Sequence, residues 1–296
     1  MTAASTATRI HFRLARNASV AVVLRRGPSN RVQMLKWDTI KDTFEKGQWL
    51  KGRVYEYRLD VSPSGTYVVY LAANYGRKID TWTAVSKPPF FTALAAWPNY
   101  GAWGGGGLFT SDTKLMLNHS VHYMEMLEGF KASKKFRIER WNETAGRGED
   151  EPINHYRMTR DGWELVDAGE ASKYQSEAKV AWVLSPAQHY LKRASRGGHV
   201  LNRFLLGVNE RGGPWYQLDF SITDRDGNLL LELGRCDCAD LDTNGDVLFA
   251  REGKIFRLPV PAKLKKPLSL DDAVELIDLK KEKFEAIEPT AGAKKW

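Results

Sequence analysis

The feature that most constrains the fold is a hairpin-like segment at residues 60–72, because similar segments return along the chain. This segment reads Asp-Val-Ser-Pro-Ser-Gly-Thr-Tyr-Val-Val-Tyr-Leu-Ala. Pro63 fixes its own φ at about −65° and Gly65 accepts a positive φ, so residues 62–65 predict a tight turn. Residues 67–71 form an unbroken run of aromatic and aliphatic side chains, which predicts a strand buried on both faces.

Comparable turns border apolar runs at five further places. Taking one position in each turn, the six turns lie at residues 17, 65, 112, 162, 211 and 245, with spacings of 48, 47, 50, 49 and 34 residues. A hairpin-bearing unit that repeats every ~40–50 residues is typical of the four-stranded blades of a β-propeller. The predicted fold class is therefore all-β, a single closed β-propeller of about six blades. Because the last spacing is short, five blades is the alternative.

A closed ring must join the two ends of the chain. Closing a loop of about 250 residues costs about 5 kcal/mol in chain entropy, beyond a constant. Propellers offset this cost by completing one blade with strands from both chain ends, which leaves no open sheet edge. We therefore expect an early strand, at residues 9–14 or at 20–24 with it, to pair beside the strands at 247–250 and 254–258.

The propeller is expected to span residues 1–260, and residues 261–296 are expected to form a C-terminal extension that packs on it or trails from it. Ser269 and Asp272 have the spacing of a capping box, which favours a short helix over residues 273–279, with a strand as the alternative. Residues 291–296 are expected to form a loose tail.

Two segments carry a resemblance to known families. Residues 60–70 resemble the Asp-x-Ser-Pro-Asp-Gly hairpin of WD-repeat-like and TolB-like β-propellers, and residues 240–258 are a second copy. The Gly-His and Trp-Asp pairs of true WD repeats are absent. Residues 48–52, 81–86 and 104–109 also resemble an uncharacterised bacterial propeller-like family. These resemblances imply the fold and bring no activity with them.

Composition narrows the class of protein. No stretch approaches 18 consecutive apolar residues, so no membrane span is expected. Residues 1–8 lack the charged start and apolar core of a signal peptide. The two cysteines, Cys236 and Cys238, are too close together to staple a fold. We therefore expect a cytoplasmic protein.

The chain is basic, with a formal net charge of +8 and a pI near 9.3. The denser basic stretches, residues 131–140 and 192–203, lack regularly interleaved aromatic side chains. A solvated surface is favoured, and binding to nucleic acid or to an acidic protein partner are the alternatives.

Two patterns are compatible with metal ligands, and for each we favour a structural interpretation. Asp240, Asp242 and Asn244 match the first half of a calcium loop, but its twelfth position is Arg251 rather than Glu, which favours a hairpin turn. Cys236 and Cys238 with His119 and His122 are four possible zinc ligands. Neither spacing is a zinc knuckle, so packing cysteines and surface histidines are favoured. No metal or cofactor is expected.

No linear catalytic motif is present, whether the Gly-x-Ser-x-Gly nucleophile elbow, the His-Glu-x-x-His zinc motif, the phosphate loop or the dinucleotide fingerprint. The four glycines at residues 104–107 precede a predicted strand, whereas an anion cradle opens a helix. Four consecutive glycines are costly to order, which indicates a backbone pressed against something or a loop that moves. We expect a protein that is not an enzyme.

The candidate partner-binding residues are Trp97, Tyr100 and Trp103, with Arg193 and Arg196 as possible charged neighbours. Exposed Trp and Tyr supply much of the binding energy at interfaces, so we expect the three aromatic residues to be at least partly exposed on one face. The alternative is that they seal the gap between adjacent blades.

These observations favour a non-catalytic β-propeller that acts as a protein-interaction scaffold or as an accessory subunit of a bacterial assembly. One alternative is a propeller hydrolase or lyase with its site in the central funnel. Another is a nucleic-acid-binding module that uses the basic surface. The sequence indicates no oligomeric state.

Overall fold

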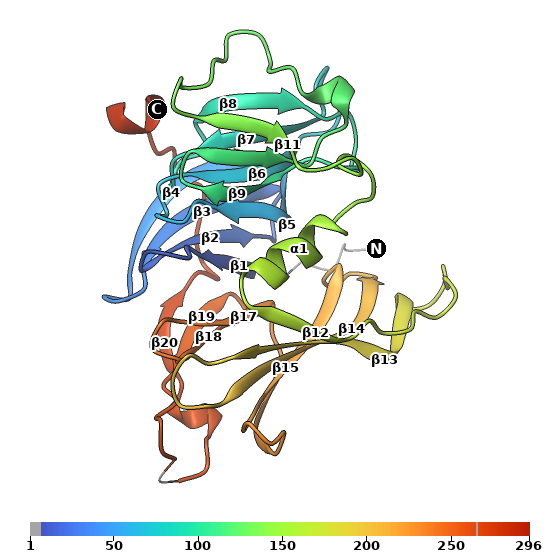
Figure 1. Cartoon of the computed structure of the whole chain (residues 1–296), viewed down its shortest axis with the longest axis vertical. Helices are drawn as coiled ribbons and strands as arrows, with labels where there is room; N and C mark the ends of the chain where they lie inside the picture. Colours follow the sequence, from blue (N-terminus) through green and yellow to red (C-terminus); the bar gives the residue numbers. More distant parts are fainter. Residues whose placement is uncertain (1–6, 265) are drawn as a thin grey trace. The chain divides into compact units, whose positions relative to one another are not determined.

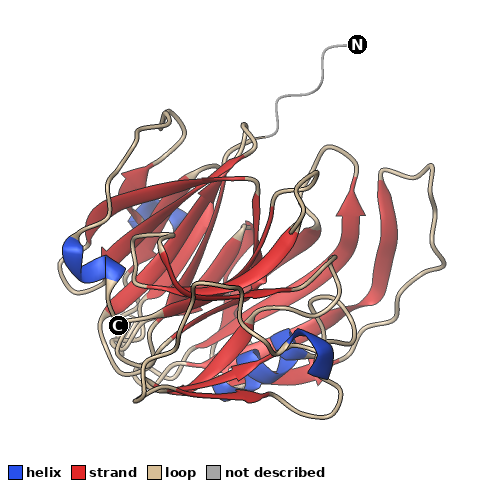
Figure 2. Ribbon diagram, turned by 90° about the horizontal axis from the view of Figure 1, so that it is seen from above, coloured by secondary structure: helices blue, strands red, loops and turns tan. Residues whose placement is uncertain are grey.

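The computed structural model of the protein describes residues 7–264 and 266–296. Within these residues the strands form five sheets that follow one another along the chain, and strands dominate the molecule (Figure 1, Figure 2). The α-helix of the described residues, α1 (Ile153–Arg160), lies between the third and fourth sheets in sequence. The all-β fold class is therefore confirmed.

Each sheet is a run of consecutive strands. The first contains β1 (Arg9–Leu14), β2 (Val20–Arg26), β3 (Arg31–Asp38) and β4 (Thr43–Lys51). The second contains β5 (Arg53–Val61), β6 (Val68–Ala73), β7 (Thr81–Ser86) and β8 (Ala93–Pro98). The third contains β9 (Gly107–Ser111), β10 (Lys114–Leu117) and β11 (Arg137–Arg140). The fourth contains β12 (Trp163–Asp167), β13 (Val180–Arg193), β14 (Val200–Glu210), β15 (Tyr216–Thr223) and β16 (Leu229–Arg235). The fifth contains β17 (Cys238–Leu241), β18 (Val247–Arg251), β19 (Lys254–Leu258) and β20 (Val274–Asp278).

The described residues form five sheets and not six, so the preferred unit count of six is wrong. The turns at residues 17, 65, 112 and 245 each join the first two strands of a sheet. The turns at 162 and 211 both belong to the fourth sheet, because the first precedes β12 and the second joins β14 to β15. Taking each turn as one unit therefore counted the fourth sheet twice.

The N-terminal strand does not pair as expected. β1 is the edge strand of the first sheet and pairs with β2, whereas β18 and β19 pair with each other and with β17 and β20. The backbone N–H of Ile10 instead donates to the carboxylate of Asp237, just before β17, at 2.9 Å. The N-terminus thus reaches the fifth sheet through a side chain and not through a strand ladder.

The chain divides into two compact units. One comprises Met1–Ile10 and Met158–Glu282 and is called the 158–282 unit; the other comprises His11–Arg157 and Lys283–Trp296 and is called the 11–157 unit. In the 11–157 unit, all six residues of β6 are buried, as the apolar run predicted. The 158–282 unit has a core of its own, which includes Phe220, Ile222 and Phe249.

The C-terminal region contributes to both units. Residues 274–278 form β20, which pairs antiparallel with β19, so the strand alternative is correct and the predicted helix is wrong. The expected loose tail is also wrong. Trp296 packs against Phe136, with ring centroids 4.6 Å apart, and its indole N–H donates to the carbonyl of Lys131 at 2.9 Å.

This contact predicts that Trp296→Ala destabilises the protein. Loss of an aromatic pair, an indole hydrogen bond and half-buried apolar area should lower the free energy of unfolding by about 1–3 kcal/mol. Urea unfolding followed by fluorescence measures this change, and Lys295→Ala, at an exposed neighbouring position, is the matched control. Equal stability of both variants and the wild type would mean that the tail is loose.

Candidate functional site

The loop at residues 99–106, which joins β8 to β9, is here called the glycine loop. Gly104, Gly105 and Gly106 have positive φ values of 68°, 80° and 72°. A Cβ atom on Gly106 would lie 2.2 Å from the carbonyl oxygen of Arg58, and one on Gly104 would lie 2.6 Å from the Cα atom of Gly146. The expectation that these glycines allow a close backbone approach is therefore confirmed.

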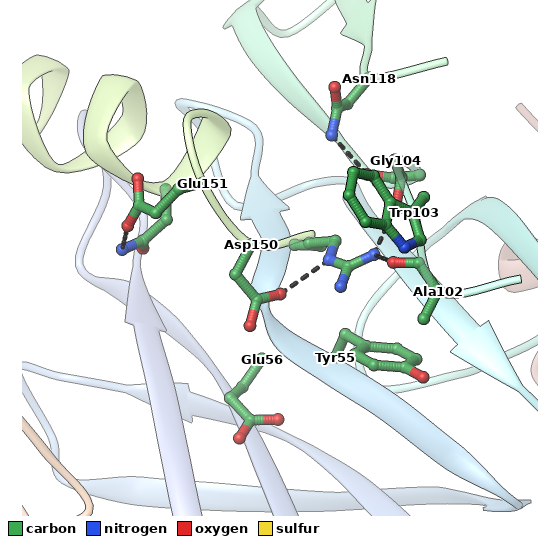
Figure 3. A network of polar contacts seen from close by, with 12 residues as sticks. Tyr55, Glu56, Ala102, Trp103, Gly104, Asn118, Asp150 and Glu151 are labelled. Atoms are coloured by element: carbon green, nitrogen blue, oxygen red, sulfur yellow. Dashed lines mark hydrogen bonds and ion pairs between the residues drawn. The ribbon is translucent and has the colours of Figure 1, made fainter. Parts of the chain in front are cut away.

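A buried guanidinium anchors this loop. Arg58, on β5, is 1% exposed, and its Nη1 atom donates to the carbonyls of Ala102 and of Gly104, the latter at 2.6 Å. Its Nε atom donates to the carboxylate of Asp150 at 2.7 Å (Figure 3). The two carbonyls flank Trp103, so one fixed cation sets the backbone on both sides of that residue. Breaking a buried ion pair of this kind typically costs about 3–5 kcal/mol.

Two further side chains hold the start of the glycine loop. The side-chain amide of Asn99, which is 2% exposed, donates to the carbonyls of Gly101 and Trp103 at 2.8 and 2.9 Å. The N–H of Gly101 donates to the hydroxyl of Thr81 at 2.7 Å. These two loop carbonyls and this loop N–H are thus satisfied by buried side chains rather than by solvent.

His119 supports the end of the glycine loop through the hydroxyl of Thr83. The N–H of Gly106 donates to the Thr83 hydroxyl, and that hydroxyl lies 2.7 Å from Nε2 of His119. The His119 Nδ1 atom is 2.9 Å from the carbonyl of Tyr123. A carbonyl only accepts, so Nδ1 carries the proton and Nε2 accepts from Thr83. Burial lowers the pKa of His119 to about 4, so the ring is neutral at pH 7.

The three candidate aromatic residues have different environments. Tyr100 is 55% exposed and Trp103 is 66% exposed, as expected. Trp97 is 1% exposed, so its expected exposure is wrong. It lies on β8, where it pairs with Thr83, and it belongs to a buried cluster that also contains Phe109. Trp97 therefore has the structural role that was the alternative for these aromatic residues, as part of the core.

The exposed aromatic residues have neighbours that sequence reasoning did not include. The rings of Tyr100 and Tyr123 lie 5.5 Å apart. The hydroxyl of Tyr75, a residue that is 59% exposed, is 2.7 Å from that of Tyr55, a ring beneath the guanidinium of Arg58. We call Tyr100, Trp103 and the half-buried Tyr123 the aromatic surface.

The two candidate arginines belong to the 158–282 unit, whereas the aromatic surface belongs to the 11–157 unit. Arg193 ends β13 and forms an ion pair with Glu164. Arg196 is exposed in the turn between β13 and β14. Both arginines are therefore surface residues of the 158–282 unit.

The possible metal ligands are occupied by other contacts. Asp242 and Asp246 both pair with Arg257, and Asp240 pairs with Lys192 at 2.6 Å. Asp242 also accepts from the N–H of Asn244, as expected for a turn.

The four possible zinc ligands lie in different units. Cys236 and Cys238 are free thiols of the 158–282 unit, whereas His119 and His122 belong to the 11–157 unit. His122 is exposed as expected, but His119 is fully buried, so its expected surface position is wrong. Residues 7–264 and 266–296 contain no group of three or more His, Cys, Asp or Glu side chains arranged to hold a metal ion.

Sequence reasoning missed the charged residues beneath the glycine loop. Arg58 lies in β5, which is buried at most positions, and a charged residue within a mostly buried strand is a signal that the sequence offers. Asp150 gives no such signal, because it lies 92 residues from Arg58 in a polar loop.

No protein-family model matches this chain, and no curated protein matches its sequence. Among the described residues, no helix has both the length and the apolar character needed to cross a membrane.

The close approach at Gly106 predicts a large loss of stability in Gly106→Ala. Gly76→Ala is the control, because Gly76 also has a positive φ but its Cβ would meet nothing within 4 Å. The control should lose about 1–2 kcal/mol from the backbone conformation alone. Gly106→Ala should lose at least about 2 kcal/mol more in urea unfolding, because the new methyl group meets backbone. Equal losses would contradict the close approach.

The buried neutral ring of His119 predicts that stability depends on pH. The unfolded ring, with a pKa of 6.5, binds a proton more readily than the folded ring, with a pKa of about 4. The stabilisation is therefore complete above pH 6.5 and decreases as the pH falls from 6.5 to 4, by about 3 kcal/mol in total. Unfolding free energies measured across this window should show a shallower decrease in His119→Gln than in the wild type. His122→Gln should keep the wild-type slope, and an unchanged slope in His119→Gln would refute the assignment.

Proposed function

We propose that this protein is a non-catalytic β-propeller of five blades that binds a partner protein through the aromatic surface. It would serve as a scaffold or an accessory subunit of a bacterial assembly, in line with its resemblance to WD-repeat-like and TolB-like hairpins. Its two free thiols fit the reducing cytoplasm as its compartment.

Contacts between the turns of successive sheets support the propeller. The N–H of Asn17, in the first hairpin of the first sheet, donates to the carbonyl of Pro63 in the first hairpin of the second at 2.9 Å. The N–H of Ser64 then donates to the carboxylate of Asp112, in the first hairpin of the third sheet, at 2.8 Å. A ring of blades places equivalent turns next to each other in this way.

The observation that best supports the binding function is that Trp103 has an exposed side chain on a backbone held by hydrogen bonds. Its side chain is 66% exposed, while the carbonyls on both sides of it are fixed by the buried Arg58. An exposed large aromatic side chain on a fixed backbone loses little further entropy on binding, so its contact area contributes fully to affinity.

The test is co-purification from the protein's own host. Wild-type tagged protein should recover a partner protein, identified by mass spectrometry, that is lost with Tyr100→Ala/Trp103→Ala. Each substitution should weaken binding of the purified partner by about 2 kcal/mol, because aromatic hot spots contribute on this scale. The free energy of unfolding should change by less than about 1 kcal/mol, since both side chains are mostly exposed.

Tyr174→Ala is the matched control. Tyr174 is 56% exposed and lies in the 158–282 unit, so its loss should leave partner recovery unchanged. Recovery of the same partner by the double variant would contradict the proposal. Recovery of nucleic acid alone, decreasing steeply with salt, would favour the alternative of a nucleic-acid-binding module.

A further inference from the structure

A second polar cluster surrounds Glu56, on the strand that also carries Arg58. The Glu56 side chain is 10% exposed and lies 3.2 Å from Nη1 of Arg26 and 3.5 Å from Nε2 of His11. Nη2 of Arg13 donates to the backbone carbonyl of Glu56 at 3.4 Å. His11 of β1 and Arg26 at the end of β2 thus meet the Glu56 carboxylate, while Arg13 of β1 contacts the Glu56 backbone.

Arg53, at the start of β5, adds a further cation. Its guanidinium lies 4.3 Å from the ring centroid of Tyr55, and that of Arg58 lies 4.7 Å from the same ring. His11, Arg26 and Arg53 together hold the pKa of Glu56 at about 2 despite its burial. Glu56 is therefore ionised at any physiological pH.

The charges of this cluster do not balance. Of four guanidinium groups, those of Arg13, Arg26, Arg53 and Arg58, only two form an ion pair with a carboxylate of the described residues. Asp150 pairs with Arg58 and Glu56 pairs with Arg26. In residues 7–264 and 266–296, no carboxylate lies within ion-pair distance of Arg13 or Arg53, and the Nε atom of each is buried without a hydrogen-bond partner.

Like charges held together in a partly buried place repel, and each buried donor without a partner costs free energy. Guanidinium groups match the geometry of carboxylate and phosphate groups, which accept two parallel hydrogen bonds. We propose that Arg13, Arg26 and Arg53, here called the arginine cluster, bind an oxyanion, a carboxylate or a phosphate group, beside Glu56. This site is separate from the aromatic surface, and it does not depend on the proposed partner binding.

The oxyanion has two possible sources, a small anion or an acidic segment of a protein, and two probes distinguish them. Isothermal titration at low ionic strength and pH 7.5 measures binding of inorganic phosphate and, separately, of an octaglutamate peptide. Arg13→Gln and Arg53→Gln should each lower the affinity for the probe that binds by roughly tenfold, since each removes one charge-assisted contact. Arg137→Gln is the control, because Arg137 is an exposed arginine of the same unit that pairs with Glu139.

Glu56→Gln gives the opposite prediction. Removing the carboxylate that competes with the ligand should strengthen binding by several-fold, whereas a purely structural Glu56 would give no gain. Arg53→Lys, which keeps the charge but lacks the planar fork, should bind with intermediate affinity and serves as the second variant if Arg53→Gln does not fold.

Each result decides the proposal. Phosphate binding that is weakened in the arginine variants and strengthened in Glu56→Gln supports a small-anion site. The same pattern with octaglutamate alone supports an acidic protein segment. Absence of binding for both probes at millimolar concentration, or binding that Arg13→Gln, Arg53→Gln, Arg53→Lys and Glu56→Gln all leave unchanged, overturns the proposal.

Discussion

The ion pair between Arg58 and Asp150 is the interaction on which the candidate site depends. A guanidinium that is 1% exposed is stable only if its charge and its donors are satisfied. Asp150 supplies the charge, and two carbonyls of the glycine loop supply acceptors. The loop and the cation therefore support each other: the carbonyls satisfy the donors of Arg58, and Arg58 satisfies the carbonyls.

The sequence predicted the fold class and most hairpins because their signals are local. Pro63 with Gly65, and Asn244 with Gly245, define turns by their own backbone preferences. The number of sheets could not be read from local signals, because it depends on which strands pair. The fourth sheet has five strands, and two of its turns resemble turns between sheets. The pairing of β1 with β2 rather than with the fifth sheet is likewise a choice among strand partners, and local sequence does not encode that choice.

The site was predictable only where a residue's own chemistry restricts it. Four consecutive glycines predicted a close backbone approach, and Gly106 against the Arg58 carbonyl provides it. Trp97 could not be distinguished from Trp103 by residue type, because exposure depends on which residue lies in β8 and which lies in the loop. Asp150 was unpredictable for the same reason, since its role arises only when the chain brings residues 58 and 150 together.

Tyr55 connects the two clusters of the 11–157 unit. The guanidinium groups of Arg53 and Arg58 both lie over its ring, 4.3 and 4.7 Å from the ring centroid, and its hydroxyl lies 2.7 Å from that of Tyr75. Attraction between each cation and the ring is worth about 0.5–2 kcal/mol and offsets part of the repulsion between the two arginines. Asp150 neutralises Arg58, whereas Arg53 has no carboxylate within ion-pair distance among the described residues. The strand β5 thus holds the glycine loop through Arg58 and brings Arg53 to the proposed anion site.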